Sequence, residues 1–167
     1  MTNSSKVIII MGVSGSGKST LGKLVADKLD YQFMDADDYH PQENIQKMAS
    51  GMALNDEDRR GWLVRLNNKI RNTIPEGLVL ACSALKESYR SILCKDIDQE
   101  FAWIYLDGTF EEILNRLKKR KEHFMPPTLL KSQFDTLEIP EYAISVDIKN
   151  SPEKIAEKIL HKLKEAP

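Results

Sequence analysis

The residues with the clearest chemical signature form a glycine-rich run close to the N-terminus. They are Gly12, Val13, Ser14, Gly15, Ser16, Gly17, Lys18, Ser19 and Thr20, and together they contain the full pattern G-x-x-x-x-G-K-[ST]. Glycines let the backbone turn so tightly that successive N–H groups point at phosphate oxygens. In such a loop we expect Lys18 to reach the β- and γ-phosphates of ATP and the Ser19 hydroxyl to bind Mg²⁺. The run predicts a P-loop nucleotide site.

The surroundings of this run strengthen the interpretation. Residues 7–11 before it are apolar throughout, as in a strand buried on both faces. Apolar residues after it recur at helical spacing: Leu21, Leu24, Val25 and Leu29. A helix that begins near Gly17 adds the positive end of its dipole to the phosphate site. The alternative, a flexible glycine-serine loop with an incidental lysine, accounts for neither flank.

A second group of chemically active residues is the acidic segment at 35–41, DADDYHP. It follows another apolar run directly, and ligands of parallel α/β sheets bind outside the carboxyl ends of strands. One carboxylate there could support the magnesium shell, while another accepts the proton of an acceptor hydroxyl group. Solvated aspartates in a turn are the alternative. A calcium loop counted from Asp35 is disfavoured, because His40 stands where glycine belongs.

A phosphate loop alone does not separate a kinase from a nucleotide-dependent binding switch. The segment Asn68–Arg71 lacks the aspartate of a guanine-reading N-K-x-D motif. A D-x-x-G match at 58–61 lies within a charged helical pattern rather than at the end of a strand. A kinase is therefore favoured, and a switch remains the rival from another functional class.

These residues need a scaffold, and the hydrophobic pattern indicates an α/β one. Strand-like runs at 7–11, 31–34, 78–82, 101–106 and 143–148 alternate with helical patterns. Asn55 and the acids after it look like a helix start, with Asn55 as N-cap. We expect one domain over residues 1–167 with a three-layer P-loop NTPase/kinase fold, in which about five parallel strands are flanked by helices.

Composition narrows the classes of partner. The chain has 167 residues with a formal net charge of −1, 41% hydrophobic and 29% charged residues. Such a balance gives no electrostatic reason to expect nucleic acid or a membrane surface as a partner. The apolar run near the start is too short for a secretory signal, and two cysteines form no disulfide framework. The cytoplasm is the expected compartment, and a homodimer is left open.

Several longer segments together resemble one family. They are MGVSGSGKST at 11–20, DADDYHP at 35–41, NIQKMASG at 44–51, LNDEDRRGWL at 54–63, CSALKESYR at 82–90 and HFMPPTLLKSQFDTLE at 123–138. The chain resembles the gluconokinases, small P-loop sugar-acid kinases that are similar in build to shikimate kinase. Two departures concern Ala53, where the family usually has proline, and the neighbourhood of Cys94, where the family often has a basic residue. Neither touches the expected chemistry.

The resemblance implies ATP-dependent phosphorylation of the 6-hydroxyl group of D-gluconate. By similarity, Asp37 occupies the hydroxyl-facing position and Asp35 the magnesium-associated one. Rivals within the same class are shikimate-type and nucleoside-monophosphate-type kinases, which an acceptor panel would separate.

An anionic acceptor needs at least one fixed cation, and three residues are candidates. Arg59 lies early in the helix that begins near Asn55. Lys86 and Arg90 follow the third strand-like run, four residues apart, and are expected on one face of the next helix. Arginine suits two-point recognition of a carboxylate, while lysine acts as a point charge. We expect Asp37 and His40 near the hydroxyl end of the acceptor. A solvated surface cation is the alternative for each of the three.

The basic run at 116–121 is expected to begin a mobile lid over approximately 116–138. Prolines at 126 and 127 break the preceding helical pattern. Lid closure would exclude water and bring Arg116 and Arg120 to the nucleotide, with Arg120 favoured as the catalytic lid residue. His123 could orient phosphate or cap the turn. A nuclear-targeting segment or a nucleic-acid patch is the alternative for this run.

Overall fold

The computed structural model describes residues 6–73, 76–120 and 126–165. They form a five-stranded parallel sheet with the strand order β2-β3-β1-β4-β5. The strands are β1 (Val7–Met11), β2 (Gln32–Asp35), β3 (Leu78–Ala81), β4 (Phe101–Asp107) and β5 (Ile144–Asp147). Each lies within one or two residues of its predicted range, so the expected α/β fold is confirmed.

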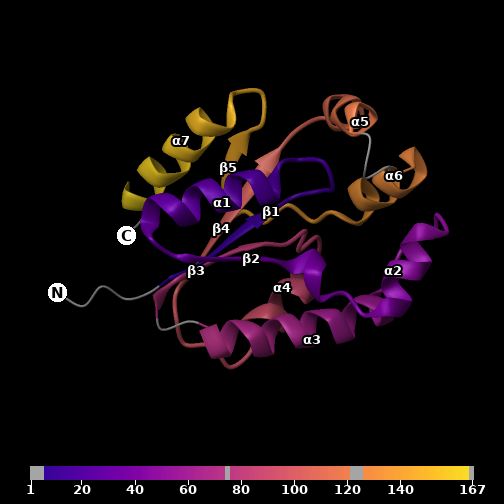
Figure 1. Cartoon of the computed structure of the whole chain (residues 1–167), viewed down its shortest axis with the longest axis horizontal. Coiled ribbons are helices and arrows are strands. Elements are labelled where there is room, and N and C mark those ends of the chain that lie inside the picture. The colour runs from indigo at the N-terminus through magenta and orange to yellow at the C-terminus, as the bar shows by residue number, and fades with distance from the viewer. Residues whose placement is uncertain (1–5, 74–75, 121–125, 166–167) are drawn as a thin grey trace.

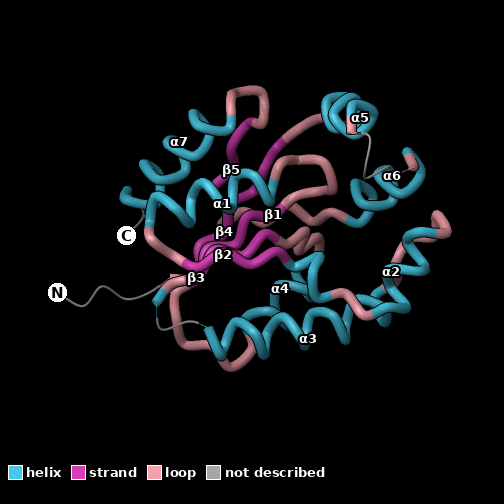
Figure 2. Tube along the Cα trace, viewed as in Figure 1, coloured by secondary structure: helices cyan, strands magenta, loops and turns pink. Residues whose placement is uncertain are grey.

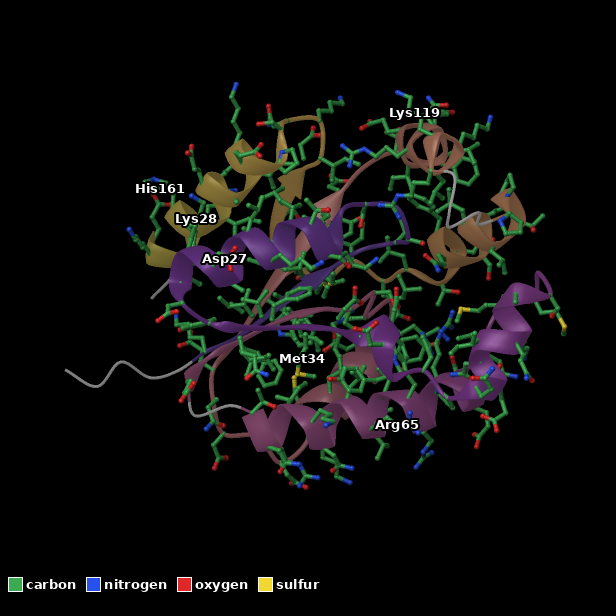
Figure 3. The ribbon with its side chains drawn as sticks, in the orientation of Figure 1. Asp27, Lys28, Met34, Arg65, Lys119 and His161 are labelled. Carbon is green, nitrogen blue, oxygen red and sulfur yellow. The ribbon has the colours of Figure 1, made fainter. Side chains whose placement is uncertain are left out.

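Helices cover both faces of this sheet (Figures 1 and 2). On one face lie α1 (Lys18–Leu29) and α7 (Pro152–Glu165), and on the other lie α3 (Asp56–Thr73) and α4 (Glu87–Cys94). The central strand β1 is buried at all of its positions, because β3 and β4 flank it and helices cover it above and below. Met34 of β2 points into the layer between sheet and α3, whereas Arg65 and His161 lie on outer helix surfaces (Figure 3).

The start of α3 follows the predicted capping pattern. The Asn55 side-chain oxygen accepts a hydrogen bond from the Asp58 amide at 2.8 Å. The Asp58 carboxylate in return accepts one from the Asn55 amide at 2.9 Å. Two orphan N–H groups are thereby satisfied, which is why the helix begins where the sequence places it.

Three further helices gather around the carboxyl ends of the strands (Figure 1): α2 (Gln42–Ala49), α5 (Phe110–Lys119) and α6 (Pro127–Thr136). The sequence pattern predicts no separate helix at α2 or at α6, since both are short. It includes α6 only as part of the lid. A short 3-10 helix at Ala36–Tyr39 joins β2 to this group. None of the described helices has the length and apolar character needed to span a bilayer.

One local prediction is wrong. Lys86 and Arg90 do not share a face of one helix, because α4 begins only at Glu87 and Lys86 is its N-cap with an extended backbone. The two side chains therefore leave the chain in different directions.

Candidate active site

The glycine-rich run connects β1 to α1 and forms the floor of a cavity of about 610 Å³. Gly15 and Gly17 have φ angles of +84° and +100°, which non-glycine residues rarely adopt. A Cβ atom at Gly15 would also lie 2.9 Å from the Leu117 side chain. These glycines let the loop pass close to α5 and enter α1 with its N–H groups free to face a ligand.

Lys18 lies at the centre of this cavity. Its Nζ atom donates a hydrogen bond to the Val13 carbonyl at 3.0 Å. Burial lowers the pKa of Lys18, while the nearby carboxylates of Asp37 and Asp35 oppose that shift. Cys82 lies at the end of β3 with 1% exposure, and its burial raises the pKa of the thiol to about 12. The thiol therefore stays protonated at neutral pH.

The acidic segment approaches the loop through Asp35. Its Oδ2 atom accepts a hydrogen bond from the Ser19 hydroxyl at 2.5 Å, and its Oδ1 atom accepts one from the Asp37 amide at 3.0 Å. Both oxygens of Asp35 are engaged, which holds the backbone of the 3-10 helix against the phosphate loop. The Asp37 side chain remains 80% exposed and lines the cavity.

A second cavity of about 360 Å³ adjoins the first. Residues that line both are Ser14, Lys18, Asp37, Met48 and Leu129. The second cavity is also lined by His40, Arg59, Trp62 and Ser83, and by Ser132 and Gln133 of α6. We call it the acceptor cavity. Its position means that a ligand there would meet the nucleotide side at Lys18 and Asp37.

Of the three cations predicted to bind the acceptor, Arg59 is the one that lines the acceptor cavity. Its side chain is largely buried, with 8% of the residue exposed, and its Nη1 atom donates to the Tyr89 hydroxyl at 2.8 Å. The Tyr89 hydroxyl donates in turn to Asp56 at 2.5 Å. This chain of hydrogen bonds fixes one end of the guanidinium of Arg59, a residue that lines the cavity.

The other two predicted cations are not brought to this cavity. Lys86 pairs with the Asp56 carboxylate at 3.2 Å on the surface. Arg90 is 2% exposed, and its guanidinium donates to Glu87 and to the carbonyl oxygens of Ala84 and Glu138 at 2.6–3.0 Å. Arg90 therefore joins α4 to the segment after α6, and Lys86 forms an ion pair with Asp56.

The cations of the predicted lid face the nucleotide side. Arg116 donates to the Ile148 carbonyl at 2.5 Å and lines a third cavity of about 270 Å³ beside Gly17. Arg120 lines both this cavity and the one over the phosphate loop. His123, also predicted at the site, lies outside the described residues.

Two residues at the site, Gln133 and Ser83, were not predicted from the sequence. Gln133 of α6 accepts a hydrogen bond from the Ser14 amide at 2.7 Å through its Oε1 atom, which joins α6 directly to the phosphate loop. Ser83, just after β3, lines the acceptor cavity. Both lie in segments quoted for the family resemblance, but nothing in their local pattern indicates a role. Trp62 is 3% exposed and also lines this cavity.

Known proteins resemble this chain over most of its length. A family model described as shikimate kinase matches residues 14–164. A probable gluconokinase of Rattus norvegicus is 44% identical, covering 95% of this chain and 97% of its own. A gluconokinase of Arabidopsis thaliana is 45% identical, covering 93% of this chain and 90% of its own. The crystal structure of a gluconokinase from Sinorhizobium meliloti 1021 is 36% identical with a TM-score of 0.89, covering 98% of this chain and 94% of that one.

A more distant likeness bears on the fold alone. The shikimate kinase of Aquifex aeolicus is 20% identical with a TM-score of 0.63, covering 95% of this chain and 96% of that one. The resemblance seen in the sequence segments is confirmed: the chain belongs to the gluconokinase family, among the P-loop kinases that the shikimate kinase model describes.

Proposed function

We propose that this protein transfers the γ-phosphoryl group of ATP to the 6-hydroxyl group of D-gluconate, giving 6-phospho-D-gluconate and ADP. The observation that carries the proposal is the junction of two cavities at Lys18 and Asp37. One cavity has a phosphate loop as its floor, and the other contains a carboxylate at its entrance and a buried arginine, Arg59, in its wall. The names of the gluconokinase relatives support the choice of acceptor.

On the nucleotide side, the loop N–H groups and Lys18 would hold the β- and γ-phosphates, and Arg120 would face the transferred group. Arg116, which lies beside Gly17 and Ile148, would border the nucleoside. Burial lowers the pKa of Lys18, and the arrival of phosphate charge would act in the opposite direction by favouring its charged form.

Mg²⁺ fits the pair of oxygen donors that Ser19 and Asp35 present. Both are hard ligands, and they lie in contact at the edge of the phosphate loop. No cluster of three or more His, Cys, Asp or Glu side chains suited to a metal occurs in the described part of the chain. The ion would therefore arrive with ATP, with phosphate oxygens and water as further ligands. When bound, it would neutralise charge that develops on the phosphoryl group.

On the acceptor side, Asp37 would accept the proton of the 6-hydroxyl group as its oxygen attacks the γ-phosphorus. Arg59 would bind the carboxylate at the other end of the sugar acid, since arginine offers paired donors that match a carboxylate. Lys86 and Arg90, predicted as direct ligands, are proposed instead to support Arg59 and the segment around Glu138.

The test is a panel of acceptors in one coupled assay of ADP formation. The four acceptors are gluconate, glucose, shikimate and AMP. Glucose shares most hydroxyl groups of gluconate but lacks its charge, so it should be a very poor substrate. Equal kcat/KM for glucose, shikimate or AMP would overturn the choice of gluconate and leave the kinase. Acceptor-independent ADP formation alone would favour a nucleotide-dependent switch.

The proposal includes a cytosolic location, which the two free thiols at Cys82 and Cys94 support. The partners are then small molecules rather than nucleic acid or membrane, in keeping with the near-neutral charge. A homodimer stays a prediction of the sequence.

A further inference from the structure

His40 occupies an unusual position at the wall of the acceptor cavity. Its ring stacks on Trp62 with centroids 4.1 Å apart and an interplanar angle of 16°. Only 6% of its side chain is exposed. The Nε2 atom lies 3.9 Å from the Oδ1 atom of Asp37, and both residues line the cavity. The stack restricts the orientation of the ring. Whether Nε2 donates or accepts a hydrogen bond therefore depends on which ring nitrogen carries the proton.

The buried side-chain amide of Asn44 determines which nitrogen of His40 carries the proton. Asn44 is 3% exposed, and its Nδ2 atom lies 2.9 Å from the Asp58 carbonyl oxygen and 3.3 Å from His40 Nδ1. A backbone carbonyl only accepts hydrogen bonds, so the nitrogen end of the amide must face Asp58. The second N–H of the same amide then points at His40 Nδ1. That ring nitrogen must therefore accept, which leaves the proton on Nε2.

We infer that Asn44 is a positioning residue that holds His40 as the neutral Nε2–H tautomer, with this N–H directed at Asp37 and the acceptor hydroxyl group. His40 is then a hydrogen-bond donor to the reacting oxygens and cannot act as the general base. Asp37 alone takes the proton. The inference deepens the proposed function and rests on it only for the identity of the acceptor, because the tautomer exists without substrate.

The charges around the ring are consistent with a neutral imidazole. Burial lowers the pKa of His40, the Asp37 carboxylate acts in the opposite direction, and Arg59 of α3 lowers the pKa further. Asp58 of α3 is paired with Lys47 of α2 at 2.6 Å and directs only its carbonyl at Asn44. A second proton on Nδ1 would also face the Asn44 N–H group, donor against donor.

The first test needs no variant. The chain has three histidines, so a two-bond ¹H–¹⁵N correlation spectrum of the unliganded protein near pH 7.5 is simple, and the His40→Gln variant identifies the His40 signals. We expect an unprotonated Nδ1 and a protonated Nε2. A protonated Nδ1, or a ring with both nitrogens protonated, would overturn the inference whatever the acceptor is.

The second test removes the amide and compares it with a matched one. Asn67 of α3 is also buried, and its Nδ2 atom also donates two hydrogen bonds, to the carbonyls of Leu93 and Lys95 at 2.9 Å, at the C-terminal end of α4 and not among the residues that line the cavity. Asn44→Ala should mix the tautomers of His40 and lower kcat about tenfold, because the donor is no longer aligned, with KM for ATP unchanged. Asn67→Ala should lose similar stability and keep both the tautomer and kcat.

Two further results would contradict the role. One is an Asn44→Ala enzyme in which His40 keeps its Nε2–H tautomer. The other is a drop in kcat for Asn67→Ala as large as that for Asn44→Ala, which would mean a loss of stability alone. If Asn44→Ala does not fold, His40→Gln and His40→Phe serve instead. Glutamine retains an N–H donor and should keep at least several-fold more kcat than phenylalanine, which retains only the stack; equal kcat for the two would overturn the donor role.

Discussion

The two sides of the active site are built in different ways. The floor of the nucleotide side is one unbroken segment within residues 12–20, to which Asp35 and Arg120 add side chains from other elements. The acceptor side is assembled from side chains on four separate stretches, represented by His40, Arg59, Ser83 and Gln133. The first depends on local conformation, and the second depends on how α3, α6 and the loop after β3 pack together.

This difference teaches where substitutions should act. A change at Lys18 of the phosphate loop removes one function without disturbing the assembly, because this side chain lines the cavity. A change on the acceptor side alters both recognition and the contacts between elements, since Arg59, Asp58 and Asn44 serve both purposes. Four substitutions with matched controls test the contrast, and they are ordered by the size of the expected effect.

Lys18→Ala tests the nucleotide side most directly. We expect kcat to fall on the order of 10³–10⁵-fold, the scale of cations that stabilise a transferring phosphoryl group. The melting temperature should stay near that of the parent, because Lys18 makes a single hydrogen bond to a carbonyl. Lys23→Ala, an exposed position on the same helix, is the control. Near-normal turnover by folded Lys18→Ala would remove the ATP site from this loop.

Asp37→Asn tests the junction between the two sides. The amide keeps the size of the carboxylate but cannot accept the proton, so kcat should fall about 10²–10⁴-fold. ATP affinity, measured by calorimetry, should change little. Asp27→Asn on the exposed face of α1 controls for loss of one surface charge. Turnover within a few-fold of the parent would make Asp37 a positioning residue only.

Arg59→Met, compared with Lys86→Met, tests which cation serves the acceptor side. Loss of a buried cation that pairs with a carboxylate costs about 2–5 kcal/mol, which is roughly 30- to 3,000-fold in kcat/KM for gluconate. Lys86 forms an exposed pair, so Lys86→Met should change the same quantity less than about fivefold. Glucose turnover should respond to neither. A larger effect for Lys86→Met would restore the cation choice made from the sequence.

Asp58→Asn tests how the acceptor side is held together, through stability and pH. Hydrogen bonds from Lys47 and then from the Asn55 amide hold the pKa of Asp58 below its ordinary value. A depressed folded-state pKa stabilises the fold above the unfolded value of about 3.9, and this stabilisation disappears as pH falls through the folded-state pKa.

The urea midpoint of Asp58→Asn should therefore lie below that of the parent at pH 7, and the gap should shrink toward about pH 3. Asp135→Asn, which breaks an exposed pair with Lys131, should show almost no gap at either pH. A gap for Asp58→Asn that does not change with pH would point to packing rather than charge.

Features that depend on neighbours along the chain could be read from the residues alone. The phosphate loop, the buried strand before it and the capped start of α3 are all local. Glycines at the positive φ angles of the loop and the exchange between Asn55 and Asp58 need no distant partner. The five strands followed from runs of apolar residues for the same reason. Even the family could be recognised, since its segments are contiguous.

Some side chains can either pack within the fold or bind a ligand, and only the tertiary structure determined which of the two each one does. Arg59 and Arg90 have the same chemistry, and both lie near a helix start. Packing places the carbonyls of Ala84 and Glu138 around Arg90, and the guanidinium donates hydrogen bonds to them. Arg59 donates to one hydroxyl group, that of Tyr89, and its other N–H groups are left for a ligand. Gln133 reaches Ser14 across 119 residues of sequence. A buried donor forms a hydrogen bond with whichever acceptor the fold brings near it, because leaving the donor unpaired is costly. The local sequence does not identify that acceptor.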